Sequence, residues 1–373
     1  MEDLPGDVMV DILSRLAVKT IIHCKCVCKK WLNLVSNSYF ANLHLLRSPA
    51  GLMIRHRPEK ITHLVTLKWV EMEDKLNHDR LHHNPGLSLN LNLSPIIQGT
   101  RTCLVGSRTR LVGSVDGLLC MSKYGNADTK AFICNPITRE YIIFPRQSHQ
   151  YSYICSYGFG VGSLTHEYKA IRLFCTQDSI LQAEIYTLGT GHWRSLGRVA
   201  YWLIGLSGAF LNGHGHWIIK DHEHLYAFDY DDETFKFLPS PPVETAEDSK
   251  FNRRTLTVVK DCLCQCAIFD SHLTIWVMKE YGIKKSWHKE VFIKRSSICP
   301  VLFSWTCDKM FLIAHFNDGT YLMFSDMGKL MSYCPHTGTI VAIENFRCCY
   351  HGVVYRPSFL KLQNFESERV HVF

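Results

Sequence analysis

Residues 4–34 read LPGDVMVDILSRLAVKTIIHCKCVCKKWLNL, and their apolar positions recur at helical spacing. These positions are Val8, Ile12, Leu13, Leu16, Val18, Ile21, Ile22, Val27, Trp31, Leu34 and Val35. Pro5 suits a first helical turn, and Asp3 and Asp7 place negative charge near its start. About forty residues in three short helices cannot bury enough surface to be stable alone. We therefore predict that the segment docks, with part of its apolar surface presented to a partner.

The pattern resembles the F-box, the short helical motif that ties a substrate receptor to the Skp-type adaptor of a cullin ubiquitin ligase. The resemblance is carried, in order, by Leu4-Pro5, Asp7, Val8, Ile12-Leu13, Arg15-Leu16, Val18-Lys19, Ile22, Cys26-Val27-Cys28-Lys29, Trp31 and Leu34. It implies a three-helix F-box over residues 1–46. The expected adaptor-docking or helix-packing positions are Leu4, Pro5, Ile12, Leu13, Leu16, Val18, Ile22, Val27 and Trp31. The alternative is a helical subdomain packed on the chain's own C-terminal domain.

Two features depart from the F-box pattern. Ala17 stands where the family usually carries proline, which predicts a slightly looser first interhelical turn. His23 and Lys25 replace arginines often found before the Cys-Val-Cys run, which predicts a weaker polar rim of the adaptor contact.

Composition places the chain among ordinary folded proteins. It has 373 residues, of which 46% are hydrophobic and 20% charged, which allows one docking module and one large domain. No apolar run is long enough to span a bilayer, and the first residues lack the basic region of a signal peptide. We expect a location in the cytoplasm, the nucleus or both, and no membrane partner. The net charge of +7 is modest and the basic residues are scattered, so no nucleic-acid partner is expected.

The cysteines and histidines raise the question of a metal site. Sixteen cysteines in a large intracellular chain predict reduced, buried thiols. Two Cys-x-Cys-x-Cys runs begin at Cys24 and Cys262, without the second knuckle or histidine pair that zinc sites usually have. The second run favours a strand with all three thiols on one core face. We predict no metal and no cofactor there.

The densest histidine cluster comprises His214, His216, His222 and His224, two on each arm of a predicted hairpin. Four imidazoles on one hairpin are able to bind a transition metal. No carboxylate or thiolate has an obvious supporting role, however, so exposed hairpin histidines are favoured over a metal site.

After about residue 50, short apolar and aromatic runs alternate with turn residues. A unit of strand, polar turn and strand recurs at 133–145, 185–197, 226–239, 275–293 and 323–334. Its late aromatic anchors are Tyr141, Trp193, Phe235, Trp287 and Tyr333, spaced by 52, 42, 52 and 46 residues. Such a period, built from strands and turns only, is typical of β-propeller blades. We predict six or seven blades with the anchors packed between them, and a strand from 51–70 that helps to complete the last blade.

The strands nearest the propeller axis are predicted at 117–121, 157–160, 210–213, 263–266 and 311–314. Glycines near such strands suit close backbone approach at a crowded axis. The rhythm breaks at 71–101, which is either a specificity loop or a disordered surface loop. The Pro-rich and charged connection 240–254 is a second candidate loop.

The absence of Gly-Gly and Trp-Asp dipeptides separates the repeats from ordinary kelch and WD40 arrays. They resemble instead the F-box-associated domain of the large plant F-box families. The matching stretches are GSVDGLLCM (113–121), NPITREY (135–141), YGFGVGSLTHEYKAIRLF (157–174), FLNGHGHWI (210–218), FDYDDETFKFLP (228–239) and IWVMKEYGIKKSWHKE (275–290). The resemblance implies a kelch-like, propeller-type substrate-recognition domain over 51–373. The whole is then an α+β chain of two modules.

No nucleophile elbow or phosphate-binding loop occurs, and the acidic run at 231–233 is predicted to be a solvated turn. We therefore expect a non-catalytic substrate receptor of an SCF-type (Skp–cullin–F-box) ubiquitin ligase. Its expected partners are a Skp-type adaptor, through it a cullin scaffold, and a target protein. Two alternatives remain at this point: a ligand- or glycan-binding propeller with no ligase role, and a metal or redox sensor.

Overall fold

The computed structural model describes residues 4–56, 64–72, 87–92, 109–123, 131–145, 151–219, 224–242, 253–297, 309–325, 329–343 and 349–373. The chain begins with helices α1 (Gly6–Leu13), α2 (Val18–Cys24), α3 (Lys29–Val35) and α4 (Ser38–Arg47). The helical module thus has one helix more than predicted. The extra helix starts because the Asn37 side chain caps it, accepting a hydrogen bond from the Tyr39 N–H at 2.8 Å.

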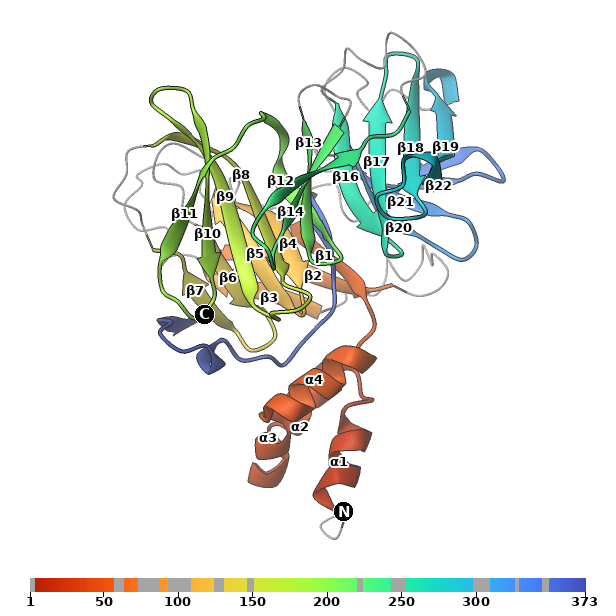
Figure 1. The fold of residues 1–373 in the computed structure, drawn as a ribbon. Coiled ribbons are helices and arrows are strands. Elements are labelled where there is room, and N and C mark those ends of the chain that lie inside the picture. The colour runs from red at the N-terminus through yellow and green to blue at the C-terminus, as the bar shows by residue number, and fades with distance from the viewer. Residues whose placement is uncertain are drawn as a thin grey trace.

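A six-bladed β-propeller follows the helices (Figure 1). Blade 1 contains β24 (Cys349–Tyr355), β1 (Gly51–His56), β2 (Leu64–Glu71) and β3 (Leu87–Asn92). Blade 2 contains β4 (Thr109–Val115), β5 (Leu118–Lys123), β6 (Ala131–Asn135), β7 (Glu140–Ile143) and β25 (Val370–Val372). Blade 3 contains β8 (Tyr151–Val161), β9 (Tyr168–Thr176), β10 (Leu181–Thr187) and β11 (Trp193–Arg198).

The other three blades each contain four strands in chain order. Blade 4 contains β12 (Leu203–Leu211), β13 (His214–Ile219), β14 (His224–Asp229) and β15 (Phe235–Pro239). Blade 5 contains β16 (Arg254–Val259), β17 (Cys262–Ile268), β18 (His272–Met278) and β19 (Trp287–Lys294). Blade 6 contains β20 (Met310–His315), β21 (Tyr321–Ser325), β22 (Leu330–Cys334) and β23 (Thr339–Ala342).

The ring is closed by strands from both ends of the chain. β1 pairs antiparallel with β24, so that Gly51 lies opposite Tyr355 and Met53 opposite Val353. β1 and β2 both belong to this closing blade, in the region where the sequence predicted a completing strand. The prediction of a loop over 71–101 was wrong for Leu87–Asn92, which form β3 of this blade, with Leu91 buried. The flanking parts of the predicted loop, 73–86 and 93–101, lie outside the described residues, as does 243–252.

The innermost strands are β4, β8, β12, β16, β20 and β24, which contact one another around the axis. The predicted inner segments 157–160 and 311–314 lie in β8 and β20, as expected. The prediction was wrong for 118–121 and 263–266, which belong to the second strands β5 and β17. The segment 210–213 covers only the end of β12 and the turn after it.

Apolar side chains fill the space between neighbouring blades. In the described part of the chain, six core clusters each join one pair of adjacent blades. The aromatic anchors contribute to them as predicted: Tyr141, Trp193, Trp287 and Tyr333 are buried and Phe235 is half-buried. One blade cannot cover its own faces, so this packing stabilises the ring as a whole.

No helix among the described residues is long and apolar enough to cross a membrane.

Candidate functional site: an exposed apolar face on the helices

Helix α1 exposes large apolar side chains on one side. Val8 and Ile12 lie one helical turn apart and are 39% and 45% exposed, and Leu4, just before the helix, is 38% exposed. Val27, between α2 and α3, is 64% exposed, and Leu32 of α3 is 41% exposed. We call Leu4, Val8, Ile12, Val27 and Leu32 the apolar face. Such exposure on a small module is typical of a surface that a partner covers.

The structure separates the nine predicted positions, which the sequence could not do. Leu4, Pro5, Ile12 and Val27 are exposed. Leu13 and Val18 are buried in the core of the helices, and Leu16, Ile22 and Trp31 are half-buried against that core. Val8 is part of the sequence motif but was not among the nine predicted positions, and Leu32 was not predicted at all. Only its place next to Trp31 on the predicted helix could have indicated that Leu32 is a candidate docking residue.

A polar link holds α1 to α4. One guanidinium nitrogen of Arg47 lies 2.7 Å from the Asp11 carboxylate, and another donates to the Ser14 hydroxyl at 2.5 Å. Arg15 binds the same carboxylate one turn away. Hydrogen bonds from Arg15 and Arg47 hold the pKa of Asp11 below its ordinary value. The link fixes α1 relative to the rest of the helical module.

The helices also pack on the propeller. Phe359, which follows β24, is buried among the helices, with ring centroids 5.8 Å from Phe40 and 5.0 Å from His44. Lys25 lies over the same ring, 4.7 Å from its centroid, so it contacts the propeller. Burial lowers the pKa of His44 to about 4, so this side chain is neutral at physiological pH. The helices therefore pack against the chain's own domain and still leave the apolar face uncovered.

Figure 1 shows α4 nearest to the propeller and the first turn of α1 farthest from it. Ile137, in the turn between β6 and β7, joins Phe359 in the helix core. The apolar face is thus carried on a module whose other side is anchored.

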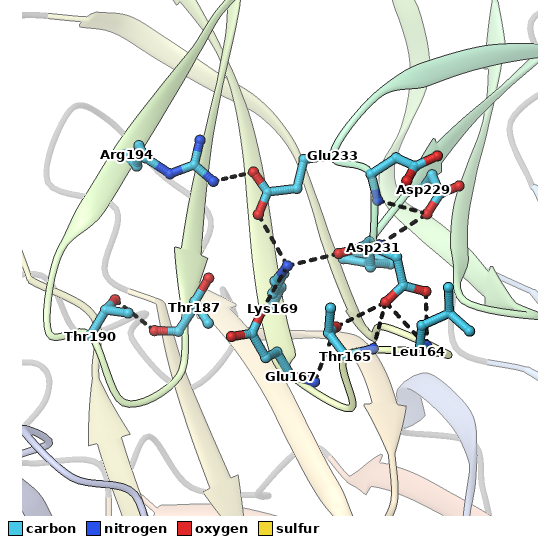
Figure 2. Close-up of polar contacts among 12 residues, drawn as sticks. Leu164, Thr165, Glu167, Lys169, Thr187, Thr190, Arg194, Asp229, Asp231 and Glu233 are labelled. Carbon is cyan, nitrogen blue, oxygen red and sulfur yellow. Dashed lines mark hydrogen bonds and ion pairs between the residues drawn. The ribbon is translucent and has the colours of Figure 1, made fainter.

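The acidic turn between β14 and β15 contacts the neighbouring blade (Figure 2). The Glu233 carboxylate lies 3.0 Å from the Lys169 ammonium and binds Arg194, both from blade 3. Asp231 accepts hydrogen bonds from the backbone N–H groups of Leu164 and Thr165. The prediction of a solvated turn was wrong for these two acids, because they bind groups from a distant part of the chain.

The three described members of the predicted histidine cluster, His214, His216 and His224, lie in different surroundings. His216 is fully buried; its ring nitrogens lie 2.9 Å from the Ala209 carbonyl oxygen and 2.7 Å from the Tyr281 hydroxyl. His214 lies 3.3 Å from the Asp229 carboxylate, at the opposite end of the hairpin from His224. Burial lowers the pKa of His216 to about 4. The expectation of exposed histidines was wrong for His216, and His222 lies outside the described residues.

The described histidine, cysteine and acidic residues hold no group suited to a metal ion. The thiols of Cys264 and Cys266 are buried in the cluster between blades 5 and 6, with Cys262 packed against it. Burial raises the pKa of the Cys264 thiol to about 12. The predicted core role of this run is confirmed.

Two family models match the chain: the F-box domain over residues 1–43 and the F-box associated beta propeller domain over residues 71–361. The second match alone spans most of the sequence. The chain belongs to the family of F-box proteins that carry an F-box associated β-propeller domain.

The chain is similar to several proteins of Arabidopsis thaliana. F-box protein At3g07870 is 26% identical over 79% of this chain and 73% of its own length. F-box protein CPR1 is 24% identical over 89% of this chain and 84% of its own length. F-box/kelch-repeat protein At3g23880 is 23% identical over 88% of this chain and 89% of its own length.

Proposed function

We propose that this protein is the substrate receptor of an SCF-type ubiquitin ligase. The observation that carries the proposal is the apolar face: five large apolar side chains in the region of α1 to α3 are exposed. A Skp-type adaptor covers this face and connects the receptor to a cullin scaffold. The complex is located in the cytoplasm, the nucleus or both.

The proposed mechanism is proximity. The propeller holds a target protein, and the helices hold the receptor on the ligase, so that lysines of the target have a high effective concentration near the charged conjugating enzyme. The receptor itself needs no catalytic group, because other subunits carry the transfer chemistry.

The packing of Phe359 and Ile137 into the helix core supports this mechanism. A flexible tether would spread the target over many positions and so lower its effective concentration at the conjugating enzyme. A fixed module presents the target in one orientation relative to the adaptor.

The test is co-expression with a Skp-type adaptor and size-exclusion chromatography. The variant Ile12→Asp/Val27→Asp places two charges on the apolar face without changing a buried side chain, and it should lose the adaptor. Leu164→Asp is the matched control, because Leu164 is 83% exposed on a propeller loop. Substitution of Leu13 would be uninformative, because that side chain is buried and its loss would unfold the helices.

A stable one-to-one complex with the wild type and the control, but not with the double variant, is the expected result. A folded double variant that binds the adaptor as well as the wild type does would overturn the docking assignment. A folded wild type that ignores the adaptor would overturn the receptor role itself.

A further inference from the structure

The outer strand of blade 5 carries a row of basic and aromatic side chains. The His272 ring of β18 stacks on Phe292 of β19, with ring centroids 4.8 Å apart. The Lys289 ammonium lies 5.6 Å from the Phe292 ring centroid and 5.2 Å from that of Trp276. We call His272, Trp276, Lys289, Phe292 and Lys294 the basic-aromatic face.

The strand register explains why these side chains gather. His272 lies opposite Lys294, and Trp276 opposite Lys289, so all of them project from one face of the β18–β19 pair. Phe292 is 47% exposed and Lys294 is also exposed. The opposite face of the same strands carries Val291 and Ile293, which are buried against blade 6. The basic-aromatic face lies on the side of blade 5 that faces blade 4: Trp276 packs against the core between these two blades, and the outer part of the face, Phe292 and Lys294, is exposed to solvent.

Positive charge is concentrated on this strand. Residues 284–295, KKSWHKEVFIKR, contain five lysines and arginines and one glutamate, a net charge of +4, against +7 for the whole chain. The glutamate, Glu290, lies 2.5 Å from Lys279, outside this segment. Lys284, Lys285 and Arg295 extend the positive charge beyond both ends of β19 and are exposed.

β19 is also an edge strand of its blade. Among the described strands it pairs only with β18, so its outer backbone groups face away from the blade. An edge strand offers N–H and C=O groups to an added extended segment, and side chains then give the selectivity. Figure 1 shows β18 and β19 well away from the four helices, so a segment bound here leaves the apolar face free.

We propose that the basic-aromatic face and the edge of β19 bind an extended acidic segment of the target protein. The proposal rests on the function proposed above and names the chemistry of the target that the receptor holds. The carboxylates of the segment pair with the lysines, and its apolar or aromatic side chains cover Phe292.

The charges favour carboxylates over a phosphate group. Phosphate sites focus several donors, often arginines, on one point. Here lysines are spread along the strand, and Lys289 and Lys294 are about 17 Å apart at the usual rise per residue. A run of carboxylates on an extended chain matches such a spacing.

The same face is poorly suited to stacking with nucleic-acid bases. Single-stranded nucleic acid needs open aromatic faces. Lys289 lies over the rings of Phe292 and Trp276, and His272 stacks on Phe292. A polypeptide segment does not need these ring faces to be open.

The experiment is fluorescence anisotropy with the full-length chain. The probe is a labelled peptide of about eight residues that alternates glutamate with tyrosine and threonine, a length chosen to match β19. A second peptide carries glutamine in place of glutamate. Lys289→Glu/Lys294→Glu should bind the acidic peptide at least about tenfold more weakly than the wild type does. Binding by the wild type should weaken as salt rises.

Two control variants match these changes. Lys260→Glu/Arg369→Glu makes the same change in net charge at exposed positions elsewhere and should bind as the wild type does. Phe292→Ser should weaken binding, whereas Phe237→Ser should not. Phe237 is 51% exposed on β15, the outer strand of blade 4, and is thus a matched exposed aromatic. Thermal melts establish that each variant is folded.

The proposal would be overturned if both charge variants lost peptide binding equally. It would also be overturned if the wild type bound the glutamine peptide as tightly as the acidic peptide. Tighter binding of a phosphorylated peptide or of oligouridine through the same lysines would overturn it in favour of those ligands. Adaptor co-elution is measured for every variant. If the receptor role is wrong, the wild type does not co-elute with the adaptor. If only this proposal is wrong, the adaptor complex forms, but the affinity for the acidic peptide is unchanged by substitution of Lys289 and Lys294.

Discussion

The Lys169 ammonium lies 3.0 Å from the Glu233 carboxylate of the next blade, and it also donates to the Tyr230 carbonyl oxygen at 2.9 Å. Only 3% of the Lys169 side chain is exposed. These contacts join blade 3 to the turn of blade 4 through a buried charge, as Figure 2 shows.

We expect Lys169→Met to destabilise the propeller by about 3 kcal/mol, because it leaves buried acceptors without their cation. The free energy of unfolding in urea measures this loss. Lys236→Met is the control, since Lys236 binds Asp229 and Asp232 of the same turn but is exposed. Similar free energies of unfolding for the two variants would show that burial of Lys169 does not add to the stability of the propeller.

The same contact predicts a dependence on pH. Burial of Glu233 opposes its ionisation, but hydrogen bonds from Arg194 and Lys169 outweigh burial and hold its pKa below the ordinary value of 4.5. A lowered folded-state pKa stabilises the protein above the unfolded value, and that stabilisation is lost as pH falls through the folded value. The stability difference between wild type and Glu233→Gln should therefore be full at pH 7 and shrink below about pH 4.5. Urea unfolding at several pH values measures it, and a constant difference would contradict the assignment.

Ala17→Pro should stabilise the helical module. Ala17 precedes α2 with φ −60° and ψ 144°, which proline adopts without strain. Among the described contacts its N–H donates no hydrogen bond, so proline removes none. Reduced freedom of the unfolded chain should add about 0.4–1 kcal/mol. Hydrogen exchange of the α2 amides reports the gain; faster exchange would mean that proline strains Leu16.

Phe359→Ala should loosen the helices from the propeller. Its ring packs against Phe40 and His44, and deletion of a buried phenylalanine typically costs about 3–5 kcal/mol. Limited proteolysis should then cleave near residues 48–50 much faster, while the blades stay protected. Phe365→Ala is the control, because Phe365 lies on the same C-terminal segment but contacts Tyr168 of blade 3. Equal cleavage in both variants would contradict a specific role of Phe359.

Local patterns were sufficient to predict the propeller and three of the four helices at the start of the chain. Helical spacing identified α1 to α3, and the aromatic period identified inter-blade packing. The inner strands were harder, because several strands behind them are also buried along their length. The second strand β17, for example, is buried from Leu263 to Ile268, so burial does not mark the axis.

Contacts between distant residues account for the other differences. Ile12 and Leu13 are neighbours with similar apolarity, and only the docked helices show that one is exposed and the other buried. Likewise, nothing near Glu233 in the sequence indicates that its partners are Lys169 and Arg194.

Closure of the ring by β1 and β24 has a consequence for synthesis of the protein. β1 leaves the ribosome soon after the helices, but its partner follows roughly three hundred residues later. At about 5–20 residues per second, the β1 edge waits about 15–60 seconds for β24. Phe359, which completes the helix core, emerges at the same late moment. The nascent chain thus carries an open edge and an incomplete helical module through most of translation, a period in which a chaperone would protect it from aggregation.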